Sequence, residues 1–583
     1  MPTLEWIGKD KVVNHHRNVP FRVLERKYSY DARGQHEEDN GSENMIIRGD
    51  NLEALKALLP RYEGRVKCIY IDPPYNTGNE NWVYNDNVND PRIRKWLGTV
   101  VGKEGEDLSR HDKWLCMMYP RLMLLQKLLE DTGAIFISID DNEHANLKLI
   151  CDEIFGCNCF VADISWQRTY STRNDSKGIV NEVEHLLVYS KRPNWQPRPL
   201  PRTAEMNARY KNPDNDIAMW RTDNATAPGA ATHQGMVYAI QHPFTGEMIY
   251  PSNNRCWTFE QDEILGIMCG WCPYELRDLE DAEQRSAVCG IAASEIRGGV
   301  QGIVLAEPLE IASRKARSIL EKGPWPRFFF TKGGQGGIAR KTYLDSVGGK
   351  LPTNFWPYTE AGHTDEAKKE LMAIFGGKVP FDTPKPRRLL EYVMKIAADE
   401  TVLILDSFAG SATTAHAALS MNQQDGGKRC FVLIEMMDYA EGVTAERVKR
   451  AISGYGEGKK SVAGLGGDFS FYELGEPLMV EDGLNPAVAP EKIREYIWFM
   501  ETKQPYASNS SANPYYLGLH NETAYYFYYE PERVTVLNDD FLATIPEKAP
   551  CSVIYADRCV LPENALQRMG VVFKKIPRDI TKL

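Results

Sequence analysis

The stretch IYIDPPYNTGN, residues Ile69–Asn79, passes from strand-forming to rigid polar sequence within a few positions. Its first three residues favour a β-strand, and Asp72 ends the apolar run. The two prolines that follow fix φ at about −65°, and Tyr75 and Asn76 then add an aromatic ring and an amide. We interpret this stretch as a strand whose exit loop holds a carboxylate, backbone carbonyls and an aromatic ring in a fixed arrangement.

Strand and helix patterns alternate on either side of this stretch. Residues 44–75 predict a strand, a turn, an amphipathic helix and a second strand, and residues 112–156 predict a helix, a strand, an acidic turn and a helix. After an irregular middle region, residues 384–436 alternate again. Alternation with short connections predicts an α/β fold with a mostly parallel sheet covered by helices.

The irregular middle region is rich in Pro, Asn, Gly and Trp and is too long to be a loop, so we expect an inserted domain. A glycine-rich linker from about Gly456 leads to a last region, Phe469 to Leu583, with its own helix and strand patterns. The predicted parts are an N-terminal arm (1–43), a first α/β part (44–160), the insert (161–380), a second α/β part (381–455), and a linker with a small C-terminal α/β domain (456–583).

The composition limits the class of protein. The 583-residue chain has a formal net charge of −11 and is 43% hydrophobic, which is typical of an ordinary globular protein with several domains. The first residues lack the apolar core of a signal peptide, and no uncharged apolar run is long enough to span a membrane. Twelve cysteines in so long a chain do not make a dense disulfide framework. We therefore expect a cytoplasmic protein without a membrane partner.

A local basic segment contrasts with the acidic whole. Between Glu310 and Lys341, eight basic residues stand against two acidic ones, interleaved with aromatic residues and the sequence KGGQGG. Such a mixture suits a surface that follows phosphates and touches bases, although a solvated helix followed by a loop would give the same pattern. The candidate DNA-contacting residues are Arg314, Lys315, Arg317, Arg327, Lys332, Arg340 and Lys341.

Two further acids end predicted strands. Asp406 precedes the loop SFAGSA, and Glu435 ends the next strand along the chain. In an open α/β sheet, ligands bind beyond the carboxyl ends of the strands, where a second acid can accept hydrogen bonds from ribose hydroxyls. The loop lacks the glycine spacing of a dinucleotide fingerprint, and no phosphate-binding GxxxxGK[ST] motif is present. The pattern favours a nucleoside without phosphates, such as S-adenosylmethionine, although an ordinary tight turn is the simpler alternative.

The stiff loop after Asp72 suits chemistry on an exocyclic base amine. The lone pair of such an amine is delocalised into the ring, and acceptors that bind its hydrogens stabilise the charge that develops when a sulfonium methyl is attacked. Asp72 offers a carboxylate and Pro73 a carbonyl, while Tyr75 could stack on the base and Asn76 could add a polar contact. The structural alternative is a rigid loop capped by an aspartate.

Asp72-Pro73-Pro74-Tyr75 resembles the catalytic tetrapeptide of the DNA amino-methyltransferases, which methylate adenine N6 or cytosine N4. Phe408-Ala409-Gly410-Ser411 resembles their cofactor loop, with Ala412 at a position where glycine is common. Gly49-Asp50 resembles the element beside the adenine, and residues 381–386 resemble the segment that closes over the methionine end. The cofactor-binding residues implied by the resemblance are Asp50, Lys385, Asp406, Phe408, Gly410, Ser411 and Glu435.

The order of these motifs resembles the circularly permuted β class, because the tetrapeptide precedes the cofactor loop with an insert between them. The flanking sequence resembles the modification subunit of Type III restriction–modification systems. The resemblance implies a Rossmann-like S-adenosylmethionine-dependent fold, a target base flipped out of duplex DNA, and an insert that reads the sequence. It also implies a homodimer and a separate helicase–nuclease restriction subunit. Aspartate at the first tetrapeptide position favours adenine.

Several alternatives stay open at this point. The chain could methylate cytosine N4, it could act on RNA or a protein, or it could be a DNA-recognition subunit whose methyl-transfer site is vestigial. Cys269 and Cys272 have the spacing of a zinc-ligand pair, with Cys256 and Cys289 nearby in sequence, but lone cysteines are often buried as small hydrophobes. We assign no metal and give no histidine a catalytic role.

Overall fold

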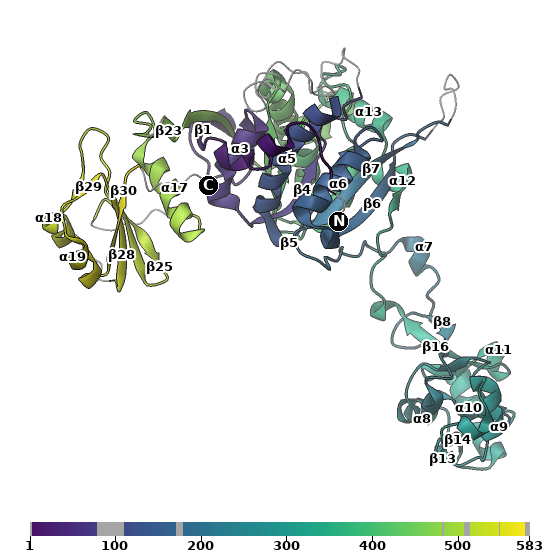
Figure 1. Ribbon diagram of the computed structural model, residues 1–583. Helices are drawn as coiled ribbons and strands as arrows, with labels where there is room; N and C mark the ends of the chain where they lie inside the picture. The colour runs from purple at the N-terminus through teal and green to yellow at the C-terminus, as the bar shows by residue number, and fades with distance from the viewer. Residues whose placement is uncertain are drawn as a thin grey trace. The chain divides into compact units, whose positions relative to one another are not determined.

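The computed structural model describes residues 3–77, 110–170, 179–480, 483–506, 513–546 and 549–577. The chain forms two compact units (Figure 1), one made of Met1–Arg198 with Pro352–Leu583 and the other of Pro199–Leu351. Within the described residues, no helix is both long and apolar enough to cross a membrane.

An eleven-stranded sheet forms the centre of the first unit. Strands β5, β4, β18, β19 and β3 run parallel, so their carboxyl ends share one edge, while β7 is antiparallel to both β5 and β6. This arrangement confirms the mixed α/β expectation. The spatial order is β17 (Phe355–Trp356), β6 (Phe160–Gln167), β7 (Val183–Ser190), β5 (Leu129–Ile139), β4 (Val66–Ile71), β18 (Leu403–Asp406), β19 (Cys430–Glu435), β3 (Met45–Arg48), β22 (Phe469–Pro477), β1 (Arg22–Asp31) and β2 (Gly34–His36).

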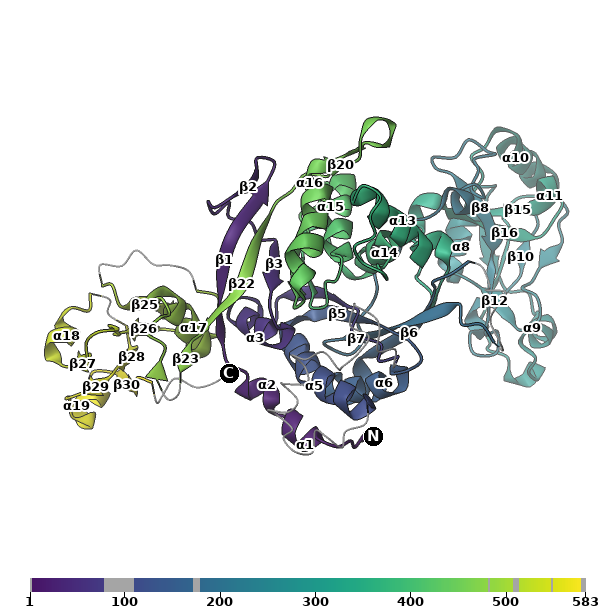
Figure 2. The same cartoon turned by 90° about the horizontal axis from the view of Figure 1, so that it is seen from above.

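Helices cover both faces of this sheet (Figure 2). The central strands are buried on both faces, which explains why they appear in the sequence as continuous apolar runs rather than as alternating patterns. One face carries α3 (Asn51–Tyr62), α5 (Arg110–Leu128) and α6 (His144–Phe155), and the other carries α13 (Thr364–Ile374), α14 (Arg387–Ala397), α15 (Thr413–Asp425) and α16 (Glu446–Ser453). The short helix α12 (Tyr358–Ala361) contacts α14.

The predicted N-terminal arm is part of this unit and not a separate segment. Strand β1 pairs antiparallel with β22, and the short helices α1 (Lys9–Val12) and α2 (His15–Asn18) contact α5. The buried Lys56 Nζ donates a hydrogen bond of 3.0 Å to the carbonyl oxygen of His16. Val12 of α1 and Val19, directly after α2, belong to the same apolar core as residues of α3 and α5. This shared core holds the first residues of the chain against the sheet.

The inserted unit is narrower than the predicted 161–380. Strands β7 and β17, and all of β6 except Phe160, fall within that range, yet they extend the large sheet, because β7 pairs with β5 from Ala134↔Ser190 to Ile139↔His185. The separate unit runs from Pro199 to Leu351. Leu200 and Lys350 bridge each other near its two ends, with both backbone N–H···O distances at 2.8 Å.

The C-terminal boundary also differs from the prediction. The residues from Phe469 to Pro477 form β22, which pairs with β3 and β1 in the large sheet. The later residues build a smaller sheet of β25 (Tyr516–His520), β26 (Thr523–Phe527), β28 (Cys551–Ala556) and β30 (Val571–Lys575) with helices α17 (Pro490–Thr502), α18 (Asp539–Ala543) and α19 (Glu563–Arg568). Phe499 of α17 packs into the core beside α3, so this α/β piece is joined to the first unit.

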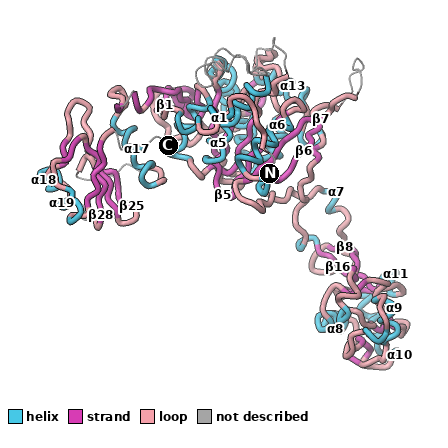
Figure 3. The backbone as a smooth tube through the Cα atoms, viewed as in Figure 1, coloured by secondary structure: helices cyan, strands magenta, loops and turns pink. Residues whose placement is uncertain are grey.

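The second unit is built mostly from short elements (Figure 3). Its sheets are β11-β10-β14-β13, β15-β16-β8 and β12-β9, and its aromatic core includes Trp220, Trp257, Trp271 and the three phenylalanines of β15. The elements are α7 (Ala204–Asn207), β8 (Trp220–Asn224), β9 (Thr226–Pro228), β10 (Ile240–Gln241), β11 (Met248–Ile249), β12 (Arg255–Trp257), α8 (Gln261–Met268), β13 (Tyr274–Arg277), α9 (Ala282–Cys289), β14 (Gly302–Leu305), α10 (Leu309–Lys322), β15 (Phe328–Phe330), α11 (Thr331–Gly334) and β16 (Ile338–Tyr343).

Lys341 lies inside this unit, which contradicts its predicted contact with DNA. Its side chain is 0% exposed, and Nζ stands 2.5 Å from a carboxylate oxygen of Asp214 and 2.5 Å from one of Asp216. The ammonium also donates a hydrogen bond of 2.7 Å to the carbonyl of Trp325. Strand β16 turns this one lysine of the basic segment toward the core, where two acids from an earlier part of the unit hold it.

We predict that Lys341→Met destabilises the protein, because two buried carboxylates would lose their cation. Removing one partner of a buried ion pair costs about 3–5 kcal/mol. Lys332→Met is the matched control, since Lys332 belongs to the same basic segment and is exposed; it should change stability by less than about 0.5 kcal/mol. Urea unfolding of the full chain followed by tryptophan fluorescence measures both. Equal transitions for the two variants would contradict the structural role of Lys341.

Candidate active site

The Asp72 loop and the bend at Ser407 to Ser411 lie side by side in the folded chain. The first follows β4 and the second follows β18, and these strands are parallel neighbours with Ile404 opposite Cys68. Asn51 links the two edges further by donating a hydrogen bond of 3.2 Å to the carbonyl of Ser407. Residues from both stretches line one cavity of about 530 Å³. The structure therefore brings together the two motifs on which the sequence interpretation depends.

The carboxylate of Asp72 is held by two side chains. Lys385 Nζ lies 2.8 and 2.7 Å from its two oxygens, and the Tyr75 hydroxyl donates a hydrogen bond of 2.8 Å to it. Burial raises the pKa of Asp72, and the nearby Lys385 ammonium opposes that shift. The carbonyl of Pro74 accepts a hydrogen bond of 2.6 Å from the Trp114 indole, which anchors the proline turn to α5. Asp72, Pro73, Pro74 and Tyr75 all line the cavity.

Lys385, predicted to bind a cofactor, has its ammonium group against the Asp72 loop. It also donates a hydrogen bond of 2.9 Å to the Tyr75 hydroxyl and stands 3.6 Å from Glu184. Burial alone would lower the pKa of Lys385, but the carboxylates of Asp72 and Glu184 outweigh it and raise the pKa. In this structure Lys385 therefore neutralises the predicted catalytic acid.

Glu184 is a site residue that the sequence did not indicate. It is buried on β7, accepts hydrogen bonds from Arg168 at 2.9 Å and from the Tyr75 hydroxyl at 3.2 Å, and lines the cavity. Burial would raise the pKa of Glu184, but Lys385 and Arg168 lower it below the usual value. Glu184 lies in the region predicted as a separate insert and belongs to no motif, so only the pairing of β7 with β5 reveals its place.

Asn76 does not have the base-contacting role that was predicted for it. Its side chain is 1% exposed, and its amide donates hydrogen bonds to the carbonyl of Arg110, at 3.1 Å, and to the carboxylate of Glu143. The backbone adopts a left-handed conformation with φ of 59° at this residue, a conformation that asparagine tolerates better than most residues. Asn76 thus fastens the end of the Asp72 loop to Glu143, which is itself fully buried.

The bend after β18 is held by the acid that precedes it. Asp406 accepts hydrogen bonds from the Phe408 backbone N–H at 3.0 Å and from the Thr414 hydroxyl at 2.5 Å. Burial raises the pKa of Asp406 to about 7, despite these two hydrogen bonds. Both Asp406 and Phe408 line the cavity. The Ser407 hydroxyl, which lines it too, is buried and has no hydrogen-bond partner within the described part of the chain.

Glu435 ends β19 beside this bend. It accepts hydrogen bonds from the backbone N–H groups of Gly410, at 2.8 Å, and Met437, at 2.9 Å. Burial raises the pKa of Glu435 to about 7. Asp50 caps α3 by accepting hydrogen bonds from the first backbone N–H groups of that helix, and Arg121 Nη2 lies 3.4 Å from its carboxylate. Asp50 is not among the residues that line the cavity, whereas Asn51 and Arg121 are.

Two backbone positions of the bend have left-handed conformations. Gly410 has φ of 50°, and a β-carbon there would stand 2.9 Å from the ring of Phe381, so a larger residue would displace that ring. Ala412, at φ of 61°, precedes α15 and takes this conformation without being glycine. The expected glycine position of the cofactor loop is therefore a position where glycine would relieve backbone strain.

A buried arginine supports the bend from behind. Arg447 donates hydrogen bonds to the Ser411 hydroxyl at 3.1 Å and to the Thr413 hydroxyl at 2.8 Å, and it pairs with Glu370 at 3.2 Å. His416 lies 3.4 Å from the same guanidinium, and burial lowers its pKa to about 3, in agreement with a packing role. Arg447 was missed because its sequence context is that of an ordinary amphipathic helix.

The remaining basic candidates lie on the surface of the second unit. Arg314, Lys315 and Arg317 are on the exposed side of α10, whose other side buries Ala312 and Ala316. Lys315 pairs with Glu307 at 2.7 Å and Arg340 with Asp223 at 3.3 Å. Arg327 and Lys332 are exposed. In the same unit, Cys256, Cys269, Cys272 and Cys289 belong to no group of three or more potential metal ligands among the described residues.

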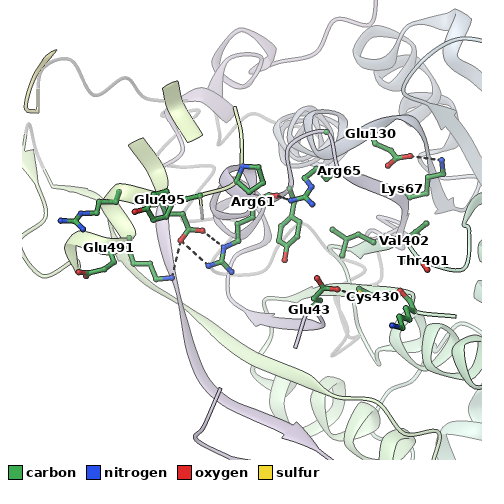
Figure 4. A pocket seen from close by; sticks show the side chains of 18 of the residues that line it. Glu43, Arg61, Arg65, Lys67, Glu130, Thr401, Val402, Cys430, Glu491 and Glu495 are labelled. Atoms are coloured by element: carbon green, nitrogen blue, oxygen red, sulfur yellow. Dashed lines mark hydrogen bonds and ion pairs between the residues drawn. The ribbon is translucent and has the colours of Figure 1, made fainter. Parts of the chain in front are cut away.

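A second cavity of about 1140 Å³ opens at the amino ends of the same strands (Figure 4). Arg61 points toward Glu495 there, with Nε 2.5 Å from a carboxylate oxygen, and Lys67 pairs with Glu130 at 2.9 Å. None of the predicted site residues lines this cavity. Lys492 also pairs with Glu495, at 3.6 Å, and we do not connect this cavity with the chemistry of the Asp72 loop.

Comparisons with known proteins agree on one family. The family model described as "DNA methylase" matches residues 66–264 and 310–446. The Type III restriction-modification enzyme StyLTI Mod subunit of Salmonella typhimurium strain LT2 is 34% identical over 446 residues, which are 74% of this chain and 57% of that protein. The EcoPI Mod subunit of Escherichia phage P1 is 29% identical over 450 residues, 74% of this chain and 63% of that protein. The chain thus spans less than two thirds of these two relatives.

A shorter relative is covered more completely. The Type II methyltransferase M.KpnI of Klebsiella pneumoniae is 30% identical over 411 residues, 68% of this chain and 81% of that protein. Among solved structures, the PvuII DNA methyltransferase (cytosine-N4-specific) is 12% identical with a TM-score of 0.31, covering 70% of this chain and 86% of that chain.

We predict that Ala412→Gly is tolerated or stabilising. Glycine would remove the cost that a left-handed backbone imposes on a non-glycine residue, about 1–2 kcal/mol. This gain offsets the additional conformational entropy that glycine loses on folding relative to alanine, about 0.5–1 kcal/mol. Ala417→Gly, in the interior of α15, is the matched control and should destabilise the protein by about 1 kcal/mol or more. Thermal unfolding of both variants checks this, and an Ala412→Gly variant as unstable as the control would contradict it.

The raised pKa of Glu435 predicts a pH-dependent stability. The folded-state pKa of about 7 exceeds the ordinary value of about 4.3, so between these values the folded chain keeps a proton that the unfolded chain releases. The contribution of Glu435 to the free energy of unfolding is therefore largest at low pH and is lost as the pH rises toward 7. Glu435→Gln lacks this loss, so its stability relative to the native chain should increase between pH 5.5 and 7.5.

Denaturant unfolding at several pH values measures the difference between the Glu435→Gln variant and the native chain. The difference in the free energy of unfolding can change by at most about 1.4 kcal/mol per pH unit, because one proton is involved. Glu473→Gln, at a partly exposed glutamate on β22 of the same sheet, serves as the control and should show a flat difference. A flat difference for Glu435→Gln as well would show that its carboxyl titrates normally.

Proposed function

The chain belongs to the DNA methylase family, and we propose that it transfers a methyl group from S-adenosylmethionine to N6 of a flipped adenine in duplex DNA. The observation that supports this function most is the shared cavity, in which the Asp72 loop and the bend at Ser407 to Ser411 meet. A methyl donor held by the bend would face a base held by the loop. Neither stretch could bring two substrates together if the strands before them were not neighbours.

The residues at the bend fit an S-adenosylmethionine nucleoside. Glu435 lies where ribose hydroxyls could donate hydrogen bonds to its carboxylate, which is otherwise buried with a raised pKa. Gly410 has no side chain and allows close approach of a ligand to the backbone, and Phe408 lines the same cavity. The Ser407 hydroxyl, which has no partner within the described residues, would supply one more polar contact there. Asp50 does not line the cavity, but it contacts Arg121 and caps α3, and Arg121 and Asn51 of α3 do line it. When bound, the cofactor supplies an electrophilic sulfonium methyl group.

Asp72 is the group that would act on the base. Its carboxylate would accept a hydrogen bond from the exocyclic amine and stabilise the positive charge that develops on nitrogen. Lys385 contacts both carboxylate oxygens in the free protein, so the amine would share the carboxylate with Lys385 or take the place of one of its contacts. Glu184, 3.6 Å from the same ammonium, is positioned to retain Lys385 when that happens. Pro73 and Pro74 keep the loop rigid while the partners of Asp72 change.

Tyr75 is the group that would stack on the flipped base. Its hydroxyl is held by Asp72 and Glu184, which keeps the ring at the cavity. An adenine inside a duplex cannot reach this ring without leaving the helix. Aspartate at the first position of the tetrapeptide favours adenine by resemblance to the family, and cytosine N4 is the alternative that product analysis separates.

We further propose that the domain is circularly permuted and that the second unit recognises the DNA sequence. Along the chain, the catalytic loop precedes the cofactor bend, and Pro199–Leu351 lies between them. The exposed residues Arg314 and Arg317 on α10 are the strongest candidates for phosphate contacts in that unit. Similarity to two Mod subunits supports a role as the modification subunit of a Type III-like system, as a homodimer with a separate helicase–nuclease restriction subunit.

We predict that Asp72→Ala lowers methyl transfer by at least about a hundredfold, the scale seen when one preorganised group that stabilises transition-state charge is removed. The assay is transfer of labelled methyl from S-adenosylmethionine to duplex DNA, followed by digestion and separation of N6-methyladenine from N4-methylcytosine. Asp131→Ala, at an exposed aspartate of the same unit, should retain full activity.

The assay also separates the competing functions. An inactive native chain that still binds duplex DNA would favour a recognition subunit with vestigial catalysis. Label found in RNA or protein and absent from DNA would overturn the proposed substrate, and full activity of the Asp72→Ala variant would overturn the proposed role of the tetrapeptide.

A further inference from the structure

Two histidines and an aspartate converge on the side of β7 that faces away from Glu184. His144 is the first residue of α6, Asp163 lies on β6 and His185 on β7. One ligand atom from each of the three lies within 4.8 Å of the others, and within the described ranges of the chain no other group of three or more His, Cys, Asp or Glu residues does so. The proposed function gives this cluster no role.

The sheet register brings these side chains to one place. On the paired strands β6 and β7, Asp163 stands opposite Leu187 and Ser165 opposite His185. Asp163 and His185 are therefore diagonal neighbours on one face of the sheet. Leu187 and Leu147 of α6 belong to the same core, so α6 covers that face, and its first residue, His144, lies at the edge of the cover. All three side chains are partly exposed, which leaves the cluster open to solvent.

The distances are close to those of a metal-ligand set. Asp163 Oδ2 lies 2.9 Å from His144 Nε2, and Asp163 Oδ1 lies 3.0 Å from His185 Nδ1. The ring centroids of the two histidines are 4.3 Å apart. Zinc binds imidazole nitrogen at about 2.0–2.1 Å, so ligand atoms around a tetrahedral ion stand roughly 3.3 Å apart. Small side-chain rotations would bring both nitrogens and one carboxylate oxygen onto a single ion.

A second carboxylate orients one of the histidines. Asp141 Oδ1 lies 3.3 Å from His185 Nε2, and Asp141 itself accepts a hydrogen bond of 2.5 Å from the side-chain amide of Asn181. Histidines that bind metals usually donate the N–H of the other ring nitrogen to a carboxylate or carbonyl, which fixes the tautomer. Asp141 placed at Nε2 leaves the Nδ1 lone pair directed at the cluster.

We propose that His144, Asp163 and His185 form a binding site for one divalent transition-metal ion of the zinc type. Two imidazoles and one carboxylate suit zinc or cobalt, whereas calcium and magnesium prefer oxygen ligands alone. Three protein ligands leave a further coordination position for water.

The ion would fasten the elements behind the catalytic loop. Consecutive residues of a strand point to opposite faces, so Glu184 faces the cavity while His185 faces the cluster. On the helix side, Glu143 directly precedes His144 and accepts a hydrogen bond from the Asn76 amide at the end of the Asp72 loop. Metal binding would therefore fix β7 and the start of α6 next to two acids that position this loop. The ion is structural and takes no part in methyl transfer.

Titration of the untagged, chelator-treated full chain with Zn²⁺ or Co²⁺ in a calorimeter tests the proposal. We expect one ion per chain, a visible Co²⁺ spectrum typical of nitrogen and oxygen ligands, and a melting temperature that rises when Zn²⁺ is added. His144→Ala and His185→Ala should each weaken binding at least tenfold and abolish the thermal shift. His36→Ala is the matched control, because His36 also stands beside an aspartate, at 3.1 Å, but without a second histidine.

Asp163→Asn provides a variant of unchanged shape should the alanine variants fold poorly, and it too should weaken binding at least tenfold. Binding that is equal in the native chain and the Asp163→Asn variant would overturn the site, as would the absence of any stoichiometric ion. Either result would leave the cluster as an ion-pair network of two histidines around one aspartate. Neither result depends on whether the chain methylates DNA.

Discussion

The parallel pairing of β4 with β18 is the constraint on which the candidate active site depends. These strands are far apart in the sequence, with a complete folded unit between them, yet Leu405 stands opposite Ile69 and both are buried. Because both strands are buried on both faces, a register shift of one residue would replace the side chains that pack against the helices on each side, which a close-packed core does not tolerate. The apolar core thus fixes the relative positions of the Asp72 loop and the Ser407 bend to within one strand spacing.

Three carboxyl groups lie at the edge that this pairing creates, and a different set of donors binds each of them. Asp72 has a lysine, Asp406 has a hydroxyl and a backbone N–H, and Glu435 has two backbone N–H groups. Burial raises the pKa of all three. A cavity with such an excess of acceptors favours a ligand that brings positive charge and hydrogen-bond donors, and the proposed cofactor brings both.

The sequence predicted the parts of the fold that depend on local patterns. Apolar runs ending in Asp72, Asp406 and Glu435 identified three strand ends and the site they share, because such runs and their end residues are contiguous. Lys341 looked like Lys332, since only the folding of β16 against Asp214 and Asp216 distinguishes a buried lysine from an exposed one. Glu184 and Arg447 were missed for the same reason. Their partners come from distant segments, and no spacing rule connects them.

The ends of the inserted unit lie next to each other, with Leu200 and Lys350 hydrogen-bonded in both directions. Chains tolerate insertions best where the two junctions are close in space and few contacts depend on what lies between them. A segment attached in this way can be swapped for a homologous one by recombination without disturbing the sheet that carries the acids. The module and its host can then diverge at separate rates during evolution.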